Sequence, residues 1–248
     1  RFPPAPRSGD FPVIAEDVRK DFGDHMVFQN ATFTIRRGEK VAFVGKNGEG
    51  KTTLVRCIMG QLDYMGSLKI GHNIKIGYFA QNQASLLDET RTVFETIDYV
   101  AVGDIRTKIR DILGAFMFGG EASEKKVKVL SGGERSRLAM IRLLLEPVNL
   151  LILDEPTNYL DVEHIEWLTK FLQNYEHAFI LISHDITFLN NVVNVIYHLE
   201  NSNLTRYTGD YNRFQEMYAI YKSQQEAAYE RQQQEVAKLE DFIARNKA

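Results

Sequence analysis

The stretch Gly45-Lys46-Asn47-Gly48-Glu49-Gly50-Lys51-Thr52 decides the fold of this chain, because it fits the phosphate-loop pattern G-x-x-x-x-G-K-[ST] at every fixed position. It follows an apolar, β-prone run at residues 41–44 and precedes a helical pattern at residues 53–59. Strand, loop and helix in this order are the context that the motif requires. The glycines allow successive backbone N–H groups, and the N-terminus of the next helix, to point at one anion. The sequence therefore predicts a site for a nucleoside triphosphate.

Individual residues of this loop have separate expected roles. Lys51 is expected to reach the β- and γ-phosphates, and the Thr52 hydroxyl to bind Mg²⁺. We expect the nucleotide also to be contacted by other residues of the loop and by the residue that follows it: Gly45, Asn47, Gly48, Gly50 and Thr53.

The bulk composition indicates a soluble protein of ordinary charge. At 248 residues, with 44% hydrophobic residues, the chain can form one large α/β domain or one domain with an appendage. Its net charge of −3 gives no overall electrostatic footprint for nucleic acid. The single cysteine, Cys57, favours a reducing compartment. Because no apolar run is as long as a membrane span and residues 1–7 lack a signal-peptide core, we expect a cytoplasmic location.

Short β-branched runs alternate with helical patterns between residues 11 and 199, which predicts an α/β domain. The early strands follow one another without helices, so we expect a small antiparallel sheet beside a main parallel one. Apolar residues at helical spacing over residues 104–118 predict a helical insert. The expected strands are residues 13–18, 31–35, 40–44, 74–80, 150–153, 179–183 and 195–199.

Three segments are expected along the chain. Residues 1–10 are rich in proline and should form an extended arm. Residues 11–209 should form the nucleotide-binding domain, with a helical subdomain at about residues 92–146. Residues 211–248 contain no glycine or proline, which predicts a linker-like helix from residue 210 onward. Its loose apolar seam fits one arm of a helical hairpin, a partner-docking helix or a solvated terminal helix.

Two acids close the apolar run of residues 150–153, as in a buried strand that delivers carboxylates to the edge of a sheet. Asp154 is expected to hold Mg²⁺ through a water, and Glu155 to act as the general base. Taken alone, the two acids could also simply end a strand at the surface, and the phosphate loop makes this alternative much weaker. His184 follows another apolar strand and is expected to hydrogen-bond the γ-phosphate or the attacking water, although a lone histidine there is more often structural.

A further anion site is predicted where Ser131, Gly132 and Gly133 open a helical run. An ordinary helix N-cap is the alternative. The anion site is favoured because this segment occurs together with the other motifs, in a fixed order along the chain.

The motifs follow one another along the chain in a fixed order: the phosphate loop, Gln81 or Gln83, residues 130–134, residues 150–155, residues 158–161 and His184. Motifs in this order resemble an ABC ATPase cassette over about residues 11–200. The resemblance implies an α/β P-loop NTPase fold with a mixed core sheet, an antiparallel β subdomain, a helical signature subdomain and a C-terminal helical extension. It makes residues 130–134 the signature, with glutamate where many members have glutamine. It further implies that Gln81, rather than Gln83, contacts Mg²⁺ and the water, that Phe22 stacks on adenine, and that Asp161 belongs to the nucleotide site.

The chain most resembles the ABC-F subfamily, whose members are soluble tandem-cassette ATPases that act on ribosomes. The likeness is carried by residues 126–135, by residues 155–161, where Tyr159 replaces the usual histidine, and by residues 207–211. Residues 66–153 are more like a second cassette, and residues 159–248 more like a first cassette with the start of its linker. Because of that combination, three interpretations of the chain stay open: a fragment, a hybrid of two cassettes, or a piece of a longer protein.

The resemblance implies an enzyme that converts ATP and water to ADP and phosphate, with ATP and Mg²⁺ bound. A second cassette, a copy or a tandem partner, would pair with it through bound ATP and close its own signature over the γ-phosphate. Such a protein would be a ribosome-associated translation factor or an antibiotic ribosomal-protection protein, with the ribosome and transfer RNA as partners. The ATP-binding subunit of a membrane transporter is the alternative, and the helix after Gly209 favours the first reading. A DNA-repair ATPase of this type would carry a longer insert than this chain has.

Overall fold

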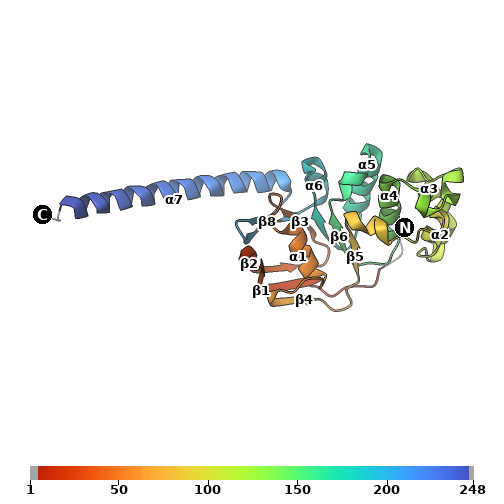
Figure 1. Cartoon of the computed structure of the whole chain (residues 1–248), viewed down its shortest axis with the longest axis horizontal. Helices are drawn as coiled ribbons and strands as arrows, with labels where there is room; N and C mark the ends of the chain where they lie inside the picture. The colour runs from red at the N-terminus through yellow and green to blue at the C-terminus, as the bar shows by residue number, and fades with distance from the viewer. Residues whose placement is uncertain (1–4, 246–248) are drawn as a thin grey trace.

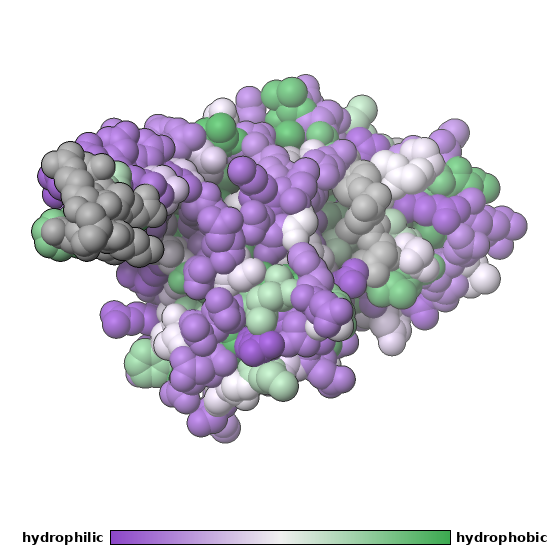
Figure 2. Space-filling model, turned by 60° about the vertical axis from the view of Figure 1, so that its left-hand side comes forward, coloured by the Kyte–Doolittle hydropathy of each residue, from purple (hydrophilic) through white to green (hydrophobic). Residues whose placement is uncertain are grey.

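The computed structural model describes residues 5–245, without the side chains of residues 81–83, 104, 159, 240, 241 and 243–245. Two β-sheets and their covering helices form an α/β body, and one long helix projects from it (Figure 1). On the face seen in Figure 2, hydrophilic residues predominate and apolar ones are scattered, as is usual for a water-facing surface.

The core sheet has six strands in the order β5-β6-β7-β3-β8-β9. Its first five strands run parallel and the last is antiparallel, so the sheet is mixed as predicted. Because parallel strands end at one edge, the residues that follow β3, β6 and β7 are brought together there. The strands are β3 (Lys40–Val44), β5 (Ile76–Phe79), β6 (Leu150–Asp154), β7 (Ala178–Ile182), β8 (Val195–Glu200) and β9 (Asn203–Thr208).

The second sheet is antiparallel, with the order β2-β1-β4. It consists of β1 (Val13–Phe22), β2 (His25–Ile35) and β4 (Met65–Ile70). The expectation of a small antiparallel sheet beside the main one is thus confirmed. The predicted strands 13–18 and 31–35 extend further than expected, since the two strands continue into a hairpin that turns at Gly23.

Helices connect and cover the sheets: α1 (Lys51–Ile58), α2 (Val93–Asp98), α3 (Ile109–Ala115), α4 (Gly132–Leu144), α5 (Val162–Gln173), α6 (Ile186–Val192) and α7 (Tyr211–Arg245). Short 3₁₀ segments link them: η1 (Gln81–Leu86), η2 (Gly103–Lys108), η3 (Gly120–Glu124), η4 (Val127–Val129) and η5 (Pro156–Tyr159). The helical insert expected at residues 104–118 is divided into η2 and α3, and α3 ends before Met117, whose φ is +62°. In the described part of the chain, no helix combines the length and apolar character needed to cross a membrane.

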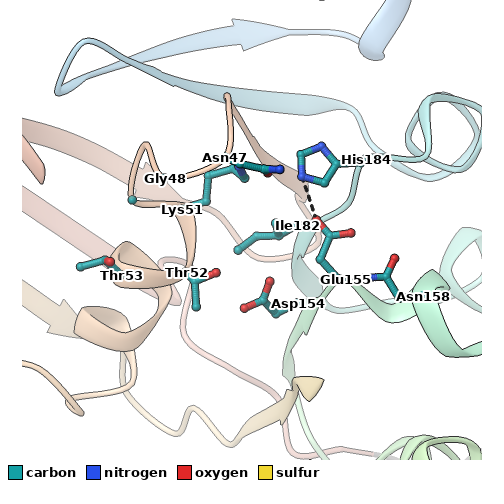
Figure 3. A pocket seen from close by; sticks show the side chains of 11 residues that line it. Asn47, Gly48, Lys51, Thr52, Thr53, Asp154, Glu155, Asn158, Ile182 and His184 are labelled. Atoms are coloured by element: carbon teal, nitrogen blue, oxygen red, sulfur yellow. Dashed lines mark ion pairs between the residues drawn. The ribbon is translucent and has the colours of Figure 1, made fainter. Parts of the chain in front are cut away.

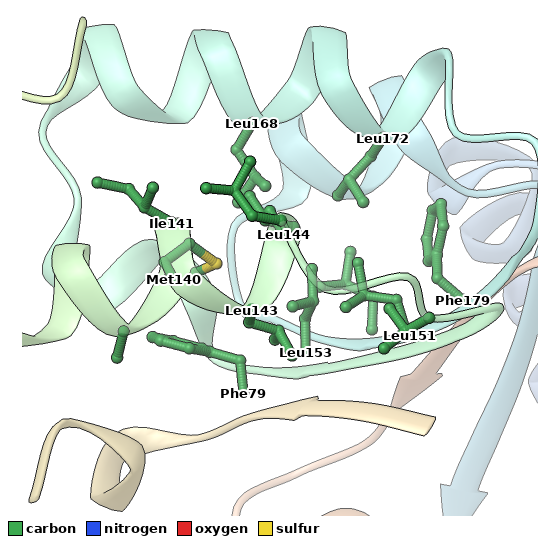
Figure 4. Close-up of a cluster of buried hydrophobic side chains, with 14 of the residues drawn as sticks. Phe79, Met140, Ile141, Leu143, Leu144, Leu151, Leu153, Leu168, Leu172 and Phe179 are labelled. Carbon is green, nitrogen blue, oxygen red and sulfur yellow. The ribbon is translucent and has the colours of Figure 1, made fainter. Parts of the chain in front are cut away.

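Two hydrophobic cores lie on opposite faces of the core sheet. Alternate residues of one strand contribute to different cores: Leu151 and Leu153 of β6 face one, and Leu150 and Ile152 face the other. The first core packs against α4 and α5 (Figure 4). The second packs against α1 and the antiparallel sheet. Burial on both faces explains why β6 reads as a continuous apolar run.

Candidate nucleotide site

A cavity of about 430 Å³ lies at the edge where β3, β6 and β7 end (Figure 3). Its size is within the range of small-molecule sites. The lining residues come from the phosphate loop with the start of α1, from the segment after β6, and from the end of β7: Asn47, Gly48, Gly50, Lys51, Thr52, Thr53, Asp154, Glu155, Asn158, Ile182 and His184.

The phosphate loop needs its glycines for two different reasons. Gly45, Gly48 and Gly50 have φ values of 150°, 85° and 102°, which side chains rarely tolerate. A Cβ atom would also lie 2.3 Å from the Leu199 carbonyl oxygen at Gly45, and 2.3 Å from Val27 Cγ1 at Gly50. The loop therefore lies tightly against β8 and β2. Gly45 is not among the residues that line the cavity, but its lack of a side chain allows the loop to take this path.

Lys51 is the buried cation of the site, only 8% exposed. Its Nζ donates to the carbonyl oxygens of Gly45 (2.8 Å) and Lys46 (2.9 Å), so the side chain folds back over the loop. Burial lowers the pKa of this ammonium group, and the nearby Glu155 and Asp154 carboxylates oppose that shift. A positive charge held beside the N-terminus of α1 suits an anion.

Thr52 and Asp154 face each other across the cavity (Figure 3). Burial raises the pKa of Asp154, while Thr52 and Lys51 act in the opposite direction. Within the described residues, no three His, Cys, Asp or Glu side chains gather as a complete metal site. A hydroxyl and one carboxylate nevertheless fit Mg²⁺, which usually completes its six oxygen ligands with substrate phosphates and water.

Glu155 leaves β6 through a sharp turn, with φ 51° and ψ 53°, a conformation that is strained for a residue with a side chain. Its backbone N–H donates to the Ile182 carbonyl (2.9 Å), and its Oε1 lies 3.3 Å from His184 Nε2. Burial raises the pKa of Glu155, and His184 partly offsets this. A carboxylate of raised proton affinity facing a cavity is suited to accept a proton.

Other residues that the sequence assigns to the site lie outside the cavity lining. Phe22, at the end of β1, is 52% exposed, with Lys20 Nζ 4.7 Å from its ring centre. Ser131 caps α4 in a reciprocal pair with Glu134, and Gly132 and Gly133 form the first turn of that helix. Asp161 caps α5. The expected roles of these residues stay predictions.

The side chains of Gln81 and Gln83 lie outside the described residues, so their expected contacts with Mg²⁺ and water also stay predictions.

Two lining residues, Asn158 and Ile182, were not assigned to the site from sequence. A signal for each was present, since Asn158 follows Glu155 by three residues and Ile182 ends the strand that leads to His184.

Comparisons with known proteins agree with this geometry. A model of the family described as ABC transporter matches residues 28–158, and a second model with that description matches residues 197–248. The uncharacterized ABC transporter ATP-binding protein YfmM of Bacillus subtilis is 40% identical over 95% of this chain and 54% of its own. ABC transporter F family member 5 of Arabidopsis thaliana is 40% identical over 87% of this chain and 32% of its own. The chain thus spans about a third to a half of these curated relatives.

Among solved structures, a dimeric ATP-binding cassette in a post-hydrolysis state, bound to ADP and phosphate, superposes with a TM-score of 0.64. The match is 21% identical and covers 79% of this chain and 98% of that one. At 21% sequence identity, this structural similarity is evidence for the fold alone.

Proposed function

Since the chain belongs to the ABC transporter family of ATP-binding, ATP-hydrolysing cassettes and has relatives in its F subfamily, we propose that it is a cytoplasmic, ribosome-associated ATPase working through its nucleotide cavity. The observation that carries the site assignment is one arrangement of groups. Lys51 and Thr52 stand on one wall of the cavity, and Asp154, Glu155 and His184 on the other.

In this proposal the loop residues bind the triphosphate through their N–H groups, and Lys51 binds the β- and γ-phosphates. Thr52 and Asp154 would hold Mg²⁺, which would supply positive charge to neutralise that of the phosphates. Glu155 takes the proton of the attacking water, and His184, 3.3 Å away, orients that carboxylate or contacts the γ-phosphate. The remaining contacts are made by Asn47, Gly48, Gly50 and Thr53.

Two outlying groups complete the nucleotide contacts that we propose. Phe22 is exposed enough to stack on the adenine ring. Gln81, at the start of η1, would reach the metal and the water.

Pairing with a second cassette explains the position of the signature. Ser131, Gly132 and Gly133 are not among the residues that line this chain's cavity. A facing cassette would bring its own copy of this helix N-terminus, together with the Asp161 loop, to the bound ATP. ATP would then stabilise the pair because it binds the paired state better, and hydrolysis would release it.

The ribosomal role is supported by the relatives of the F subfamily and by the long helix α7. Translation or antibiotic protection of the ribosome would follow from how this helix is placed when the cassettes pair. The sequence of residues 211–248 has six basic and six acidic residues, so any contact of this segment with transfer RNA would need more than net charge.

Glu155→Gln tests the hydrolytic role. It should leave Mg·ATP affinity near the parental value and slow turnover by about 10²–10⁴, because the amide cannot accept the proton. Calorimetry measures the affinity, and phosphate release measures the turnover. A variant with parental turnover would show that Glu155 is not the base.

Lys51→Ala is the matched control on the opposite wall of the cavity. It removes the cation instead of the base, so tight Mg·ATP binding itself should be lost. Unchanged affinity would contradict the phosphate-loop assignment.

Co-sedimentation separates the ribosomal role from that of a transporter subunit. With a non-hydrolysable ATP analogue, the Glu155→Gln protein should pellet with ribosomes, and Lys51→Ala should not. If neither variant pellets while the parental chain still hydrolyses ATP, the transporter-subunit alternative is favoured.

A further inference from the structure

His164, in the first turn of α5, is a buried polar residue that the proposed reaction does not use. It is 2% exposed. Its ring stacks on Phe116, with ring centres 5.2 Å apart and planes at 29°. Phe116 in turn packs edge-on against Trp167 at 4.6 Å. The imidazole thus lies between the end of α3 and the N-cap of α5.

The backbone N–H and the ring nitrogen Nδ1 of His164 both point at one carboxylate. Its backbone N–H donates to Asp161 Oδ1 at 3.1 Å, and its Nδ1 lies 2.5 Å from the same oxygen. These hydrogen bonds lower the pKa of Asp161, so the carboxylate is ionised and can only accept. Nδ1 must therefore carry the proton. The other nitrogen, Nε2, is buried without a hydrogen-bond partner among the described atoms.

Asp161 is the far end of the loop that carries Glu155 and Asn158. The near end is held where the Glu155 N–H donates to Ile182. Between the two ends the hydrogen bonds are long, 3.4 Å from Asn158 to Glu155 and 3.3 Å from Leu160 to Thr157. The loop is also held by Leu160, which packs against the first core, and by the Thr157 hydroxyl, 3.5 Å from that of Ser183. At the far end the polar contacts converge on the Asp161 carboxylate, which also lies 3.8 Å from Arg137 of α4.

We propose that His164 is a positioning residue of the hydrolytic site: by donating from Nδ1 to Asp161, it holds the loop that aims Glu155 into the cavity. The inference rests on the proposed function, because it takes Glu155 to activate water. His164 itself touches neither nucleotide nor water and acts through Asp161.

The decisive variant is His164→Phe, which keeps an aromatic ring on Phe116 and removes both ring nitrogens, the Nδ1 donor among them. Turnover should fall about tenfold, as expected for loss of a hydrogen bond to a charged group. KM for ATP should be unchanged, since no cavity-lining residue is altered. Tm should be equal or higher, because the unpartnered Nε2 is also removed. Parental turnover, or a fall in turnover that follows a fall in Tm, would overturn the proposal.

His164→Asn is the matched rescue variant, because its amide N–H can replace Nδ1 while the stack on Phe116 is lost. Its Tm should fall, yet its turnover should stay within about twofold of the parental rate. Turnover as slow as that of His164→Phe would contradict a role for the donor. Emission from Trp167, the only tryptophan, reports whether packing around Phe116 survives in each variant.

The tautomer of His164 can also be measured directly, in an experiment that does not depend on ATP turnover. In nitrogen-15 NMR of the full chain, the ring of His164, assigned by its disappearance in His164→Phe, should show the Nδ1–H tautomer. The Nε2–H tautomer would overturn the inference even if the protein hydrolyses ATP. Failure of the proposed function would appear differently, as parental turnover in Glu155→Gln.

Discussion

At the scale of single residues, Gly50 is required both by its positive φ and by the lack of space for a Cβ atom, whereas Gly48 is required by its positive φ alone. Both have positive φ, but only at Gly50 would a Cβ collide with the buried Val27. Gly50→Ala should therefore lower the free energy of unfolding by about 2–4 kcal/mol, the sum of left-handed strain and overpacking. Gly48→Ala, with open space around it, should cost about 1 kcal/mol. Urea unfolding measures both, and equal losses would contradict the role given to Val27.

How much of the site could be predicted also depends on the residue. Thr52, Asp154, Glu155 and His184 were predictable because a motif or a strand end marks each of them, and the parallel sheet brings strand ends together. The positive φ of Glu155 could not be predicted from the sequence, since it is imposed by the turn after β6. The stacking of His164 on Phe116 was not predictable either, because it joins α5 to the end of α3, which is distant in sequence.

At the scale of elements, buried strands were predictable and exposed edge strands were not. β6 and β7 are continuous apolar runs because both faces are covered. β4 and β9 lie at sheet edges, carry mostly exposed or half-exposed residues, and contain Gly66, Ser67 and Lys69 or Asn203 and Arg206. Without a buried face on one side there is no apolar alternation for a pattern to detect. The short helix α2, with only six residues, lies at the start of the helical subdomain expected at about residues 92–146 but was not predicted as a separate helix.

In the described residues up to 239, the long helix α7 packs against the body through its first three turns. Phe214 is buried against Tyr207 and His198, and Tyr218 donates to Glu200 at 2.5 Å. From residue 223 to residue 239 every side chain is exposed. A helix without tertiary packing is marginally stable in water.

Hydrogen exchange should therefore divide α7 in two. Peptides from residues 211–222 should be protected, and those from residues 223–239 should exchange far faster, because local opening there breaks no packing. Phe214→Ala should extend fast exchange into the first segment. Equal protection along the whole helix would contradict this division.

At the scale of the whole molecule, the core sheet joins both hydrophobic cores through the same strands. Leu151 and Ile152 are adjacent in β6 but bury their side chains on opposite faces. Neither core can lose its packing without disturbing the strand that supports the other. Cooperative unfolding of both cores is the expected consequence.

Leu151→Ala and Ile152→Ala test this coupling, because each damages one core only. Each should lower stability by about 2–5 kcal/mol, the usual range for a buried aliphatic residue. Trp167 fluorescence reports the first core, and labelling of Cys57, the only thiol, reports the second. Both probes should shift to the same urea midpoint in either variant, whereas Val129→Ala, at a residue 62% exposed, should move neither. If Ile152→Ala moved the Cys57 transition and left the Trp167 transition in place, the two cores would unfold independently, and the shared sheet would not couple them.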